Sequence, residues 1–378
     1  MAKLSEICNI QSGGTPSRSC VEYWENGKIP WVKISDIKDK ELNQTEEFIT
    51  ELGVEKSSAK LFPKGTILYS IFATLGEVCI LNIDATTNQA IAGLQLTNES
   101  VLPDYLYYYL VSKKDFVNYI GRGVAQNNIN LKILRNMEIP IPNKEEQERI
   151  VLRLNKLNQC ISLRKQQLKK LDELVKSRFI EMFGDPVNNS KGLPELTLPE
   201  LGEFGRGVSK HRPRNDPKLL GGKYPLIQTG EVANSNLYIT EYESTYSELG
   251  FKQSKLWQKG TLCITIAANI AKTAILTFDA CFPDSVVGFK ANDKTNNIFI
   301  HYWFSFFQAI LEAQAPESAQ KNINLKTLSE LKIIIPTIDL QNQFAEFVEQ
   351  TDKLKFEVKE ALEKLETLKK SLIQQYFG

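Results

Sequence analysis

Two stretches of the chain show the hydrophobic spacing of long amphipathic helices. Residues 143–184 contain no proline, and no glycine before the last position, and hydrophobic side chains recur there every three or four residues. Residues 337–378 repeat the same phases. The positions on this spacing are Ile150, Leu154, Leu157, Ile161, Leu168, Leu171, Val175 and Met182 in the first stretch and Phe344, Val348, Thr351, Val358, Leu362, Leu365, Leu372 and Tyr376 in the second. Each stretch predicts a helix of about 40 residues, or about 60 Å at about 1.5 Å per residue.

The hydrophobic stripe of each predicted helix needs a partner surface. Arg164 and Arg178 are the only breaks in the first stripe, and Lys355 and Lys369 interrupt the second. A stripe with a period close to 3.5 residues is typical of helices that pack against another helix. We therefore expect the two helices to form an antiparallel coiled coil about a pseudo-twofold axis. The alternative, in which each helix packs on its own globular part, leaves the long regular stripe unexplained.

Both helices are predicted to begin just after a proline. Asn143 and Thr337 are the predicted N-caps, because their side chains can accept a hydrogen bond from the first turn. The acidic residues Glu145, Glu146 and Asp339 follow at once and favour the positive end of the helix dipole.

The two helices belong to a longer internal repeat. Residues 126–184 return at residues 320–378 without a gap, and about 20 of the 59 aligned positions are identical. The offset is 194 residues, and both copies end in Phe-Gly. Three earlier segments correspond in the same order, namely residues 4–15 with 198–209, 64–71 with 259–266, and 88–95 with 283–290. The chain therefore consists of two tandem halves, each with a variable globular part followed by a better-kept helical part.

The globular parts are predicted to be mixed α and β. Short β-branched or apolar runs, bounded by Gly, Pro, Asn or Asp, predict strands. These runs are residues 29–34, 66–71, 78–81 and 91–96 in the first half, and 261–266 and 286–289 in the second. Helices are predicted at 104–118 and 298–313, and both contain consecutive aromatic residues. Because consecutive side chains point all round a helix, we interpret these aromatics as core or interface residues rather than as a base-stacking surface.

Composition and charge narrow the possible classes of protein. With 42% hydrophobic and 24% charged residues, the 378-residue chain can bury two substantial cores. It has no apolar run of membrane-spanning length and no start like that of a signal peptide, so we expect it in the cytoplasm. Six cysteines without a CxxC pair and only two histidines favour free thiols and no metal site. The 46 basic and 45 acidic residues nearly cancel, so any nucleic-acid surface must be local.

Catalytic motifs are missing from the sequence. There is no GxGxxG, no GxxxxGK[ST] and no HExxH. Pro283-Asp284 with Lys290 partly matches a nuclease pattern, but Gly288 stands where that pattern needs an acid. The sequence also lacks the Asn-Pro-Pro-aromatic or Asp-Pro-Pro-Tyr motif with which an amino-methyltransferase holds an extruded base. We interpret the chain as a recognition or scaffold subunit rather than an enzyme.

Four motifs of the repeat carry a family resemblance. They are Gln126-x-Asn-Ile-Asn-Leu-Lys, Ile139-Pro-Ile-Pro, Glu145-Glu-Gln-Glu-Arg-Ile and Phe183-Gly-Asp-Pro. With the order variable domain, helix, variable domain, helix, they closely resemble the specificity (S) subunit of type I restriction-modification systems over essentially the whole chain. The second copy departs from the pattern at Asp339-Leu-Gln341, where the Glu-Gln pair is lost, so we expect partner contacts there to be less faithful to the family.

The resemblance implies a non-catalytic DNA reader with an α+β fold. Target recognition domains at 1–142 and 185–336 each read one half of a bipartite double-stranded DNA target, and helices at 143–184 and 337–378 set the spacer. The resemblance also implies two methyltransferase (modification) subunits, which carry S-adenosylmethionine and methylate adenine. Restriction endonuclease/translocase subunits, with ATP and Mg²⁺, can join them. No cofactor is expected in this chain.

Side chains that read base edges should lie on loops that face the groove. In the first domain the candidates are Ser12, Thr15, Arg18, Lys33, Ser35, Ser70, Thr74, Arg122, Gln126 and Asn127. In the second domain they are Arg206, Lys210, His211, Arg212, Arg214, Gln228, Thr229, Asn234, Asn269, Lys272, Gln320 and Lys321. The alternative for each one is a solvated loop residue or a turn former. The loop 206–214 is favoured as a set, because its four Lys and Arg residues lie in an otherwise slightly acidic domain.

Two other functions remain open from the sequence. A coiled-coil adaptor without DNA specificity would use the helices alone. The recognition subunit of a type II system that cuts on both sides of its site would keep the reading role and change only the partner's chemistry. An enzyme is the least favoured reading because motifs are lacking.

Overall fold

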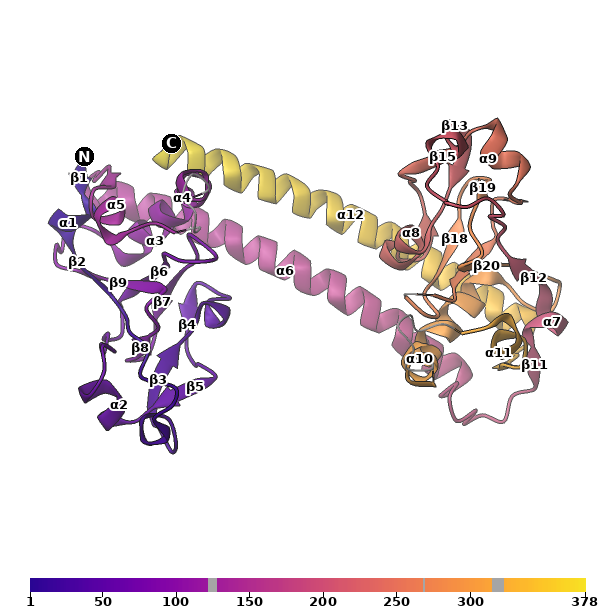
Figure 1. The fold of residues 1–378 in the computed structure, drawn as a ribbon, viewed down its shortest axis with the longest axis horizontal. Coiled ribbons are helices and arrows are strands. Elements are labelled where there is room, and N and C mark those ends of the chain that lie inside the picture. Colours follow the sequence, from indigo (N-terminus) through magenta and orange to yellow (C-terminus); the bar gives the residue numbers. More distant parts are fainter. Residues whose placement is uncertain (122–127, 268, 315–322) are drawn as a thin grey trace. The chain divides into compact units, whose positions relative to one another are not determined.

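The computed structural model describes residues 1–121, 128–267, 269–314 and 323–378, and it divides into two compact units. Unit 1 comprises Met1–Lys165 and Glu360–Gly378, and unit 2 comprises Gln166–Lys359. The boundaries fall inside the two long helices of Figure 1, α6 (Lys144–Phe183) and α12 (Ile338–Phe377). Each unit therefore contains one globular part, the start of one long helix and the end of the other.

Unit 1 is built on a five-stranded sheet with the order β2-β9-β6-β7-β4 and a three-stranded sheet with the order β5-β3-β8. The strands are β2 (Cys8–Ser12), β9 (Ile91–Leu96), β6 (Ile67–Ser70), β7 (Val78–Leu81), β4 (Glu41–Leu42), β5 (Glu47–Ile49), β3 (Ile29–Val32) and β8 (Thr86–Thr87). A further pair joins β1 (Ala2–Lys3) to β10 (Glu138–Ile139). The helical segments are α1 (Leu4–Ile7), η1 (Val21–Tyr23), η2 (Ile34–Asp36), α2 (Glu51–Glu55), α3 (Pro103–Ser112), α4 (Lys114–Gly121) and α5 (Leu131–Arg135).

Unit 2 repeats this plan with a five-stranded sheet, β12-β20-β17-β18-β14, and a four-stranded sheet, β15-β13-β19-β16. The strands are β12 (Gly202–Arg206), β20 (Val286–Ala291), β17 (Leu262–Thr265), β18 (Thr273–Leu276), β14 (Tyr238–Ile239), β15 (Ser244–Tyr246), β13 (Leu220–Leu226), β19 (Ala280–Cys281) and β16 (Leu256–Trp257). A further pair joins β11 (Glu195–Thr197) to β21 (Lys332–Ile334). The helical segments are α7 (Leu198–Leu201), η3 (Pro217–Leu219), α8 (Thr229–Asn234), α9 (Glu248–Lys252), α10 (Asn297–Gln314) and α11 (Leu325–Ser329).

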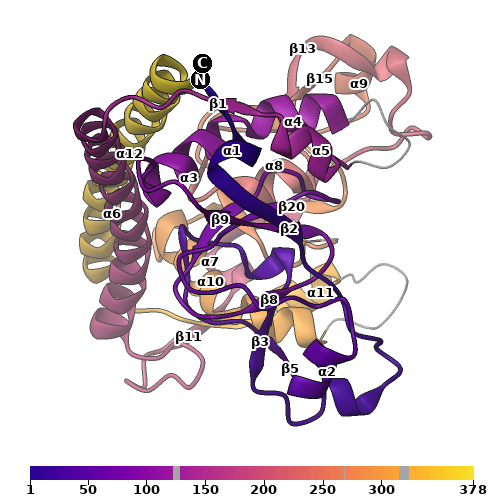
Figure 2. The ribbon, with the colours of Figure 1, turned by 90° about the vertical axis from the view of Figure 1, so that its left-hand side faces the viewer.

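In unit 1 the start of α6 packs against the end of α12. Ile150 and Leu154 are buried in the same core as Phe377, whose ring centroid lies 5.2 Å from that of Tyr105 on α3. Figure 2 looks onto this unit, where the two long helices run side by side next to α3. The Arg153 guanidinium also donates to the Tyr376 hydroxyl at 3.0 Å. Two helices that meet start to end in this way are antiparallel.

In unit 2 the end of α6 packs against the start of α12. Phe179 and Phe183 are fully buried, with ring centroids 5.3 and 5.6 Å from that of Phe344. Phe299 of α10 stacks on Phe179 at 5.4 Å. Each long helix thus begins on its own globular part and ends in the core beside the other one. This arrangement confirms the predicted antiparallel helix pair and explains why the stripe runs the full length of each helix.

A buried glutamine fastens the start of each long helix to its globular part. Gln147 is fully buried, and its side chain accepts from the Leu102 amide (3.0 Å) and donates to the Ser100 (2.8 Å) and Pro142 (2.9 Å) carbonyls. The Asn143 side chain caps α6 by accepting from Glu146 N–H at 2.9 Å, as predicted. Without the glutamine side chain, this loop amide and these two carbonyls would lose a hydrogen-bond partner. The glutamine therefore fixes the residue at which α6 begins.

The equivalent glutamine makes the same connection in unit 2. Gln341 is fully buried, accepts from the Thr295 hydroxyl at 2.8 Å and donates to the Lys294 (3.1 Å) and Pro336 (2.9 Å) carbonyls. The glutamine points into the core and is kept in both copies, so the second copy loses only Glu146 of the Glu-Gln pair, which is replaced by the exposed Leu340. Less faithful partner contacts at this position stay a prediction.

The mixed α and β fold class is confirmed, with one local correction. The helix predicted at 104–118 is divided into α3 and α4. Its aromatic run is core, since Tyr105, Tyr108 and Tyr109 are buried, and the hydroxyls of Tyr105 and Tyr109 donate to the Pro140 and Glu138 carbonyls at 2.9 Å. Across the part of the chain that the structure describes, no helix is long and apolar enough to cross a membrane.

Candidate nucleic-acid interface

The first strand of each five-stranded sheet leads into a loop that leaves the sheet in the same way in both units. Gly13 N–H donates to Ile91 O at 3.0 Å in unit 1, and Gly207 N–H donates to Val286 O at 2.9 Å in unit 2. A Cβ on either glycine would lie 2.4 Å (Gly13) or 2.1 Å (Gly207) from a backbone carbonyl oxygen, so a larger residue does not fit. The two loops therefore start from equivalent points. They end at equivalent points too, since Thr50 N–H donates to Tyr23 O and Ser247 N–H donates to Leu219 O, but the unit 2 loop is two residues longer.

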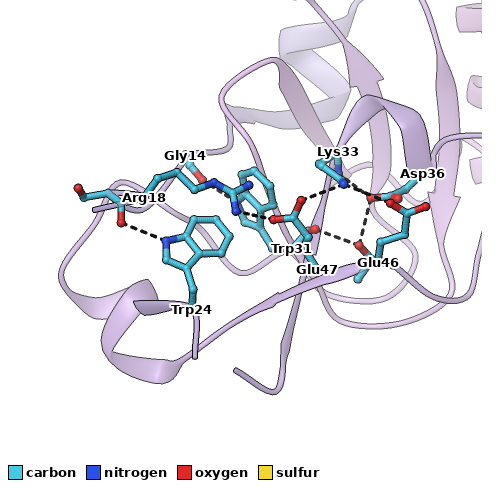
Figure 3. Close-up of polar contacts among 10 residues, drawn as sticks. Gly14, Arg18, Trp24, Trp31, Lys33, Asp36, Glu46 and Glu47 are labelled. Carbon is cyan, nitrogen blue, oxygen red and sulfur yellow. Dashed lines mark hydrogen bonds and ion pairs between the residues drawn. The ribbon is translucent and has the colours of Figure 1, made fainter. Parts of the chain in front are cut away.

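Arg18 lies on this loop in unit 1 and is held from two sides (Figure 3). Its Nη1 contacts Glu47 Oε2 at 2.6 Å. Its guanidinium carbon lies 3.6 Å from the ring centroid of Trp24 and 4.8 Å from that of Trp31. Stacking of this kind combines dispersion with attraction between a cation and the π face. The side chain nevertheless remains 54% exposed.

Both tryptophans are anchored by the loop that carries Arg18. Trp31 Nε1 donates to Gly14 O at 3.1 Å, and Trp24 Nε1 donates to Ser17 O at 3.0 Å. Their rings meet edge to face with centroids 5.0 Å apart. Trp31 is buried, so the loop is hydrogen-bonded to an aromatic ring that the core holds in place.

Lys33 extends the ionic network next to this loop. Its amine lies 2.9 Å from Glu47 and 3.2 Å from Glu46, and its backbone N–H donates to Asp36 at 2.8 Å. Partial burial alone would raise the pKa of Glu47, but hydrogen bonds from Arg18 and Lys33 outweigh it, and the pKa lies below its ordinary value. Hydrogen bonds to Glu47 and Glu46 raise the pKa of Lys33. Both shifts favour the charged forms of Glu47 and Lys33.

Unit 2 carries a basic cluster on the equivalent loop. Arg212, which follows Gly207 by five residues as Arg18 follows Gly13, donates through Nη1 to Ser209 O (2.6 Å) and His211 O (2.9 Å), and its Nη2 lies 3.5 Å from Asp284. Arg214 forms an ion pair with the same carboxylate. Asp284 corresponds to Gln89 of unit 1, which accepts a hydrogen bond from Thr15. The same position therefore anchors the loop in both units by different chemistry.

A second contact fixes the middle of this basic loop. The Gln253 side chain accepts hydrogen bonds from the backbone amides of Lys210 and His211, the latter at 3.0 Å. The His211 Nε2 atom lies 3.2 Å from an Asp216 carboxylate oxygen. The side chains of Arg206, at the start of this segment, and of Lys210, in its middle, are exposed. The cluster predicted at 206–214 thus forms one surface with an ordered backbone.

A comparison of this sequence with models of protein families shows to which family the chain belongs. The family model of the type I restriction modification DNA specificity domain matches residues 1–173 and 195–369. The chain belongs to this family.

Individual relatives agree with the family match. A type I restriction enzyme MjaIX specificity subunit from Methanocaldococcus jannaschii is 33% identical over 272 residues, which cover 67% of this chain and 62% of that protein. The match thus spans less than two thirds of the relative's length. The EcoprrI specificity subunit from Escherichia coli is 25% identical over 93% of this chain and 87% of its own. In a structural study of complex assembly in the type I R-M system, one chain superposes with a TM-score of 0.64 at 18% identity, covering 100% of this chain and 96% of that one.

Other candidate DNA-contacting residues of this specificity-domain chain lie just before η2 and α8, the helical segments that follow a strand of the smaller sheet in each unit. Lys33 precedes η2 and Gln228 precedes α8, and each backbone N–H donates to an acid three residues on, Asp36 at 2.8 Å and Glu231 at 3.1 Å. The sheets match here too, because Trp31 pairs with Thr86 and Leu226 with Cys281 in parallel. The side chains of Ser35, Gln228 and Asn234 are exposed, and Thr229 is partly buried.

One candidate of the specificity domains is buried and hydrogen-bonded within its own turn. Ser70 is fully buried, and its hydroxyl donates to Thr74 O at 2.5 Å and accepts from Glu77 N–H at 2.8 Å. Thr265 makes the same turn in unit 2, where Asn269 O and Lys272 N–H are its partners. Ser70 is a turn former, whereas Thr74 and Asn269 are exposed at the two tips and Lys272 is partly exposed beside the second.

Of the remaining candidates, one lies in the described part of the chain and five lie outside it. Ser12, the last residue of β2, is partly buried. Arg122, Gln126, Asn127, Gln320 and Lys321 lie outside the described residues. Sequence reasoning missed Trp24, Trp31 and Glu47, which lie up to 29 residues from Arg18. The repeat alignment offered one signal, since it places Gly13 and Gly207 at the same position and an arginine follows each of them by five residues.

Proposed function

We propose that this chain is the specificity subunit of a type I restriction-modification system. In this role it is a non-catalytic reader of a bipartite double-stranded DNA target. The observation that carries the proposal is the pair of equivalent loops, which present exposed arginines from the same place in two units of one specificity-domain chain. Arginine is the residue best suited to reading guanine edges and phosphates, so two such loops suit two half-sites.

In this proposal the long helices set the distance between the two half-sites and bind the partner subunits. The start of each helix is fastened by a buried glutamine to its own globular part, and its end is packed into the core beside the other. In this proposal the helices set the spacer between the two half-sites. Two methyltransferase (modification) subunits would bind the helices, and restriction endonuclease/translocase subunits would join them.

Catalysis is assigned to the partners. S-adenosylmethionine and adenine methylation would belong to the methyltransferase subunits, and ATP and Mg²⁺ to the restriction subunits. In the portion of the chain that the structure describes, no group of three or more His, Cys, Asp or Glu is placed to hold a metal ion. Because the proposed complex acts on DNA, we place it in the cytoplasm.

The first experiment is single-molecule sequencing of modified bases in cells that express this chain with its methyltransferase, compared with cells that lack only this chain. We expect methylated adenine in a split motif that disappears without the chain. A complex that assembles and yet leaves methylation unchanged would favour a coiled-coil adaptor. A split motif cut on both sides would instead identify the type II arrangement.

Exchanging one globular part tests the independence of the two readers. Replacing residues 1–142 by the corresponding part of another specificity subunit, with both helices retained, is expected to change one half of the methylated motif and leave the other half intact. A chimaera that alters both halves, or neither, would contradict one reader in each unit.

A further inference from the structure

Arg18 combines a fixed position with an exposed hydrogen-bonding edge. Glu47 holds one terminal nitrogen at 2.6 Å, and Trp24 covers one face of the guanidinium at 3.6 Å. A stacked ring contacts the face of the group and leaves its edges free to donate. Little conformational entropy remains to be lost when such a side chain binds a partner.

The number of donors decides what Arg18 can bind. A guanidinium has five N–H donors in a rigid fork, and Glu47 accepts from one of its terminal nitrogens. The exposed remainder matches the paired acceptors O6 and N7 of a guanine in the major groove. An adenine offers one acceptor and one donor there, so the same fork would discriminate against it.

The equivalent arginine of unit 2 is used differently. Two carbonyls of its own loop, Ser209 O and His211 O, accept from Arg212 Nη1, and Asp284 lies beside Nη2. These contacts fold the loop back on itself and leave Arg212 fewer donors than Arg18. Arg212 is therefore a matched control, with the same residue type, the same distance from the glycine that starts the loop and a similar exposure of 55%.

We propose that Arg18 reads a guanine in the half-site bound by unit 1, with Glu47 and Trp24 as its positioning residues. The inference rests on the proposed function and adds the residue and the base. It predicts that the half-site read by unit 1 contains a G·C pair at which Arg18 supplies the discrimination. The competing role for an exposed arginine is a phosphate contact, which would add affinity without sequence information.

The test uses the assembled complex of this chain with its methyltransferase subunits. The methylated motif first defines both half-sites, and binding is then measured to duplexes in which each base pair is replaced in turn. For Arg18→Ala we expect discrimination at one G·C pair of one half-site to fall by about 5- to 150-fold, with other positions unchanged. Arg18→Lys keeps the charge and lacks the fork, so we expect it to lose most of that discrimination while retaining overall affinity.

Three further variants separate reading from folding. Glu47→Gln and Trp24→Phe should weaken discrimination at that same base pair, because both loosen the guanidinium without removing it. Arg212→Ala should leave the unit 1 half-site untouched. Complex assembly and the other half-site report on folding in every case, and Arg18→Lys keeps the inference testable if Arg18→Ala fails to assemble.

The outcomes distinguish a failure of the proposed function from a failure of the inference about Arg18. If the wild-type complex binds without sequence preference, the proposed function fails. If the wild type is specific but Arg18→Ala and Arg18→Lys lower binding evenly at all sequences, or Lys fully restores it, Arg18 is a phosphate contact and this inference is overturned. An unchanged base preference in both variants overturns it as well.

Discussion

Units 1 and 2 use the same framework to carry different loops. Gln147 and Gln341 make matching connections at the start of the long helices, and Asn130 and Asn324 cap α5 and α11 in the same way. The loops diverge, with two tryptophans around Arg18 in unit 1 and a basic turn around Arg212 in unit 2. Buried polar groups without partners are costly, so the framework resists change, whereas the exposed loops are free to vary.

The contacts between the long helices and the globular parts also differ. In unit 1, Lys40 of the globular part reaches Asp104 at 2.8 Å and Asn155 of α6 at 2.9 Å. In unit 2, Lys355 of α12 reaches Asp172 of α6 at 2.8 Å, with only 13% of its side chain exposed. By the repeat, Lys355 corresponds to the buried Ile161. One of the two breaks predicted in the second stripe is thus a largely buried lysine that pairs with an exposed aspartate.

The largest difference between the units in the free energy of unfolding should come from substitutions of the phenylalanines that end the long helices. Phe183 is fully buried, with ring centroids of Phe179 and Phe299 at 4.9 and 5.1 Å, so Phe183→Ala is expected to lower the free energy of unfolding by about 3–5 kcal/mol. Phe377 borders an open groove shared with Lys132, so Phe377→Ala should lose about 2–3 kcal/mol. Urea unfolding of the whole chain measures both. An equal loss would show that the two helix ends are packed alike.

The two glutamines should behave alike, which tests the common framework. Gln147→Ala and Gln341→Ala each leave several buried backbone groups unpaired, so each is expected to lower the free energy of unfolding by about 2–4 kcal/mol. The exposed neighbour Glu148 provides the control, since Glu148→Ala should change it by less than about 0.5 kcal/mol. A large difference between the two glutamine variants would mean that one unit supports its helix by other contacts.

The sequence was sufficient for the framework because its signals are local or repeated. The 3,4 spacing and the 194-residue offset predict α6, α12 and their antiparallel pairing. The repeat also keeps Gln147 and Gln341 in register, although nothing local says that they point inward.

The loops were harder to predict, because their chemistry depends on pairs that are distant in sequence. Arg18 meets Glu47 across 29 residues, and Arg214 meets Asp284 across 70. Sequence spacing does not reveal such partners. It also does not distinguish an exposed hydroxyl such as that of Ser35 from the buried one of Ser70, which closes a turn.

Acid should weaken unit 2 more than unit 1 through His301. Burial lowers the pKa of His301 from 6.5 to about 4, while its Nδ1 faces the Thr273 hydroxyl at 2.9 Å. Between these pH values the unfolded chain binds the proton and the folded chain does not, so stability is full above pH 6.5 and is lost as the pH falls toward 4. The equivalent residue in unit 1, Tyr107, takes up no proton in this range.

The size of this effect is measurable by substitution. Between pH 7 and pH 5 we expect His301 to account for about 1–2 kcal/mol of lost stability, which His301→Phe should abolish. Urea unfolding of both proteins at the two pH values measures the difference. An identical pH dependence in wild type and variant would show that carboxylates, and not His301, cause the acid sensitivity.

The smallest expected contrast lies between two ion pairs that join the long helices. Lys165 and Glu366 in unit 1 are 2.9 Å apart, with 59% and 44% of their side chains exposed. Exposed pairs lose most of their attraction to solvent screening, so their coupling free energy should be below about 0.5 kcal/mol and should vanish at high salt. Lys355 and Asp172 in unit 2 are equally close, but the shielded lysine also meets Asp352 at 3.2 Å.

Double-mutant cycles of the two pairs, run at low and high salt, sharpen this difference. Asp172 and Glu366 occupy the same repeat position, so the comparison isolates the burial of the lysine. We expect a coupling of about 1 kcal/mol for Lys355 with Asp172 that salt reduces only in part, because the less exposed amine is screened less. Equal couplings would mean that Asp352 alone supports Lys355, and that the two units hold their helices together by packing rather than by charge.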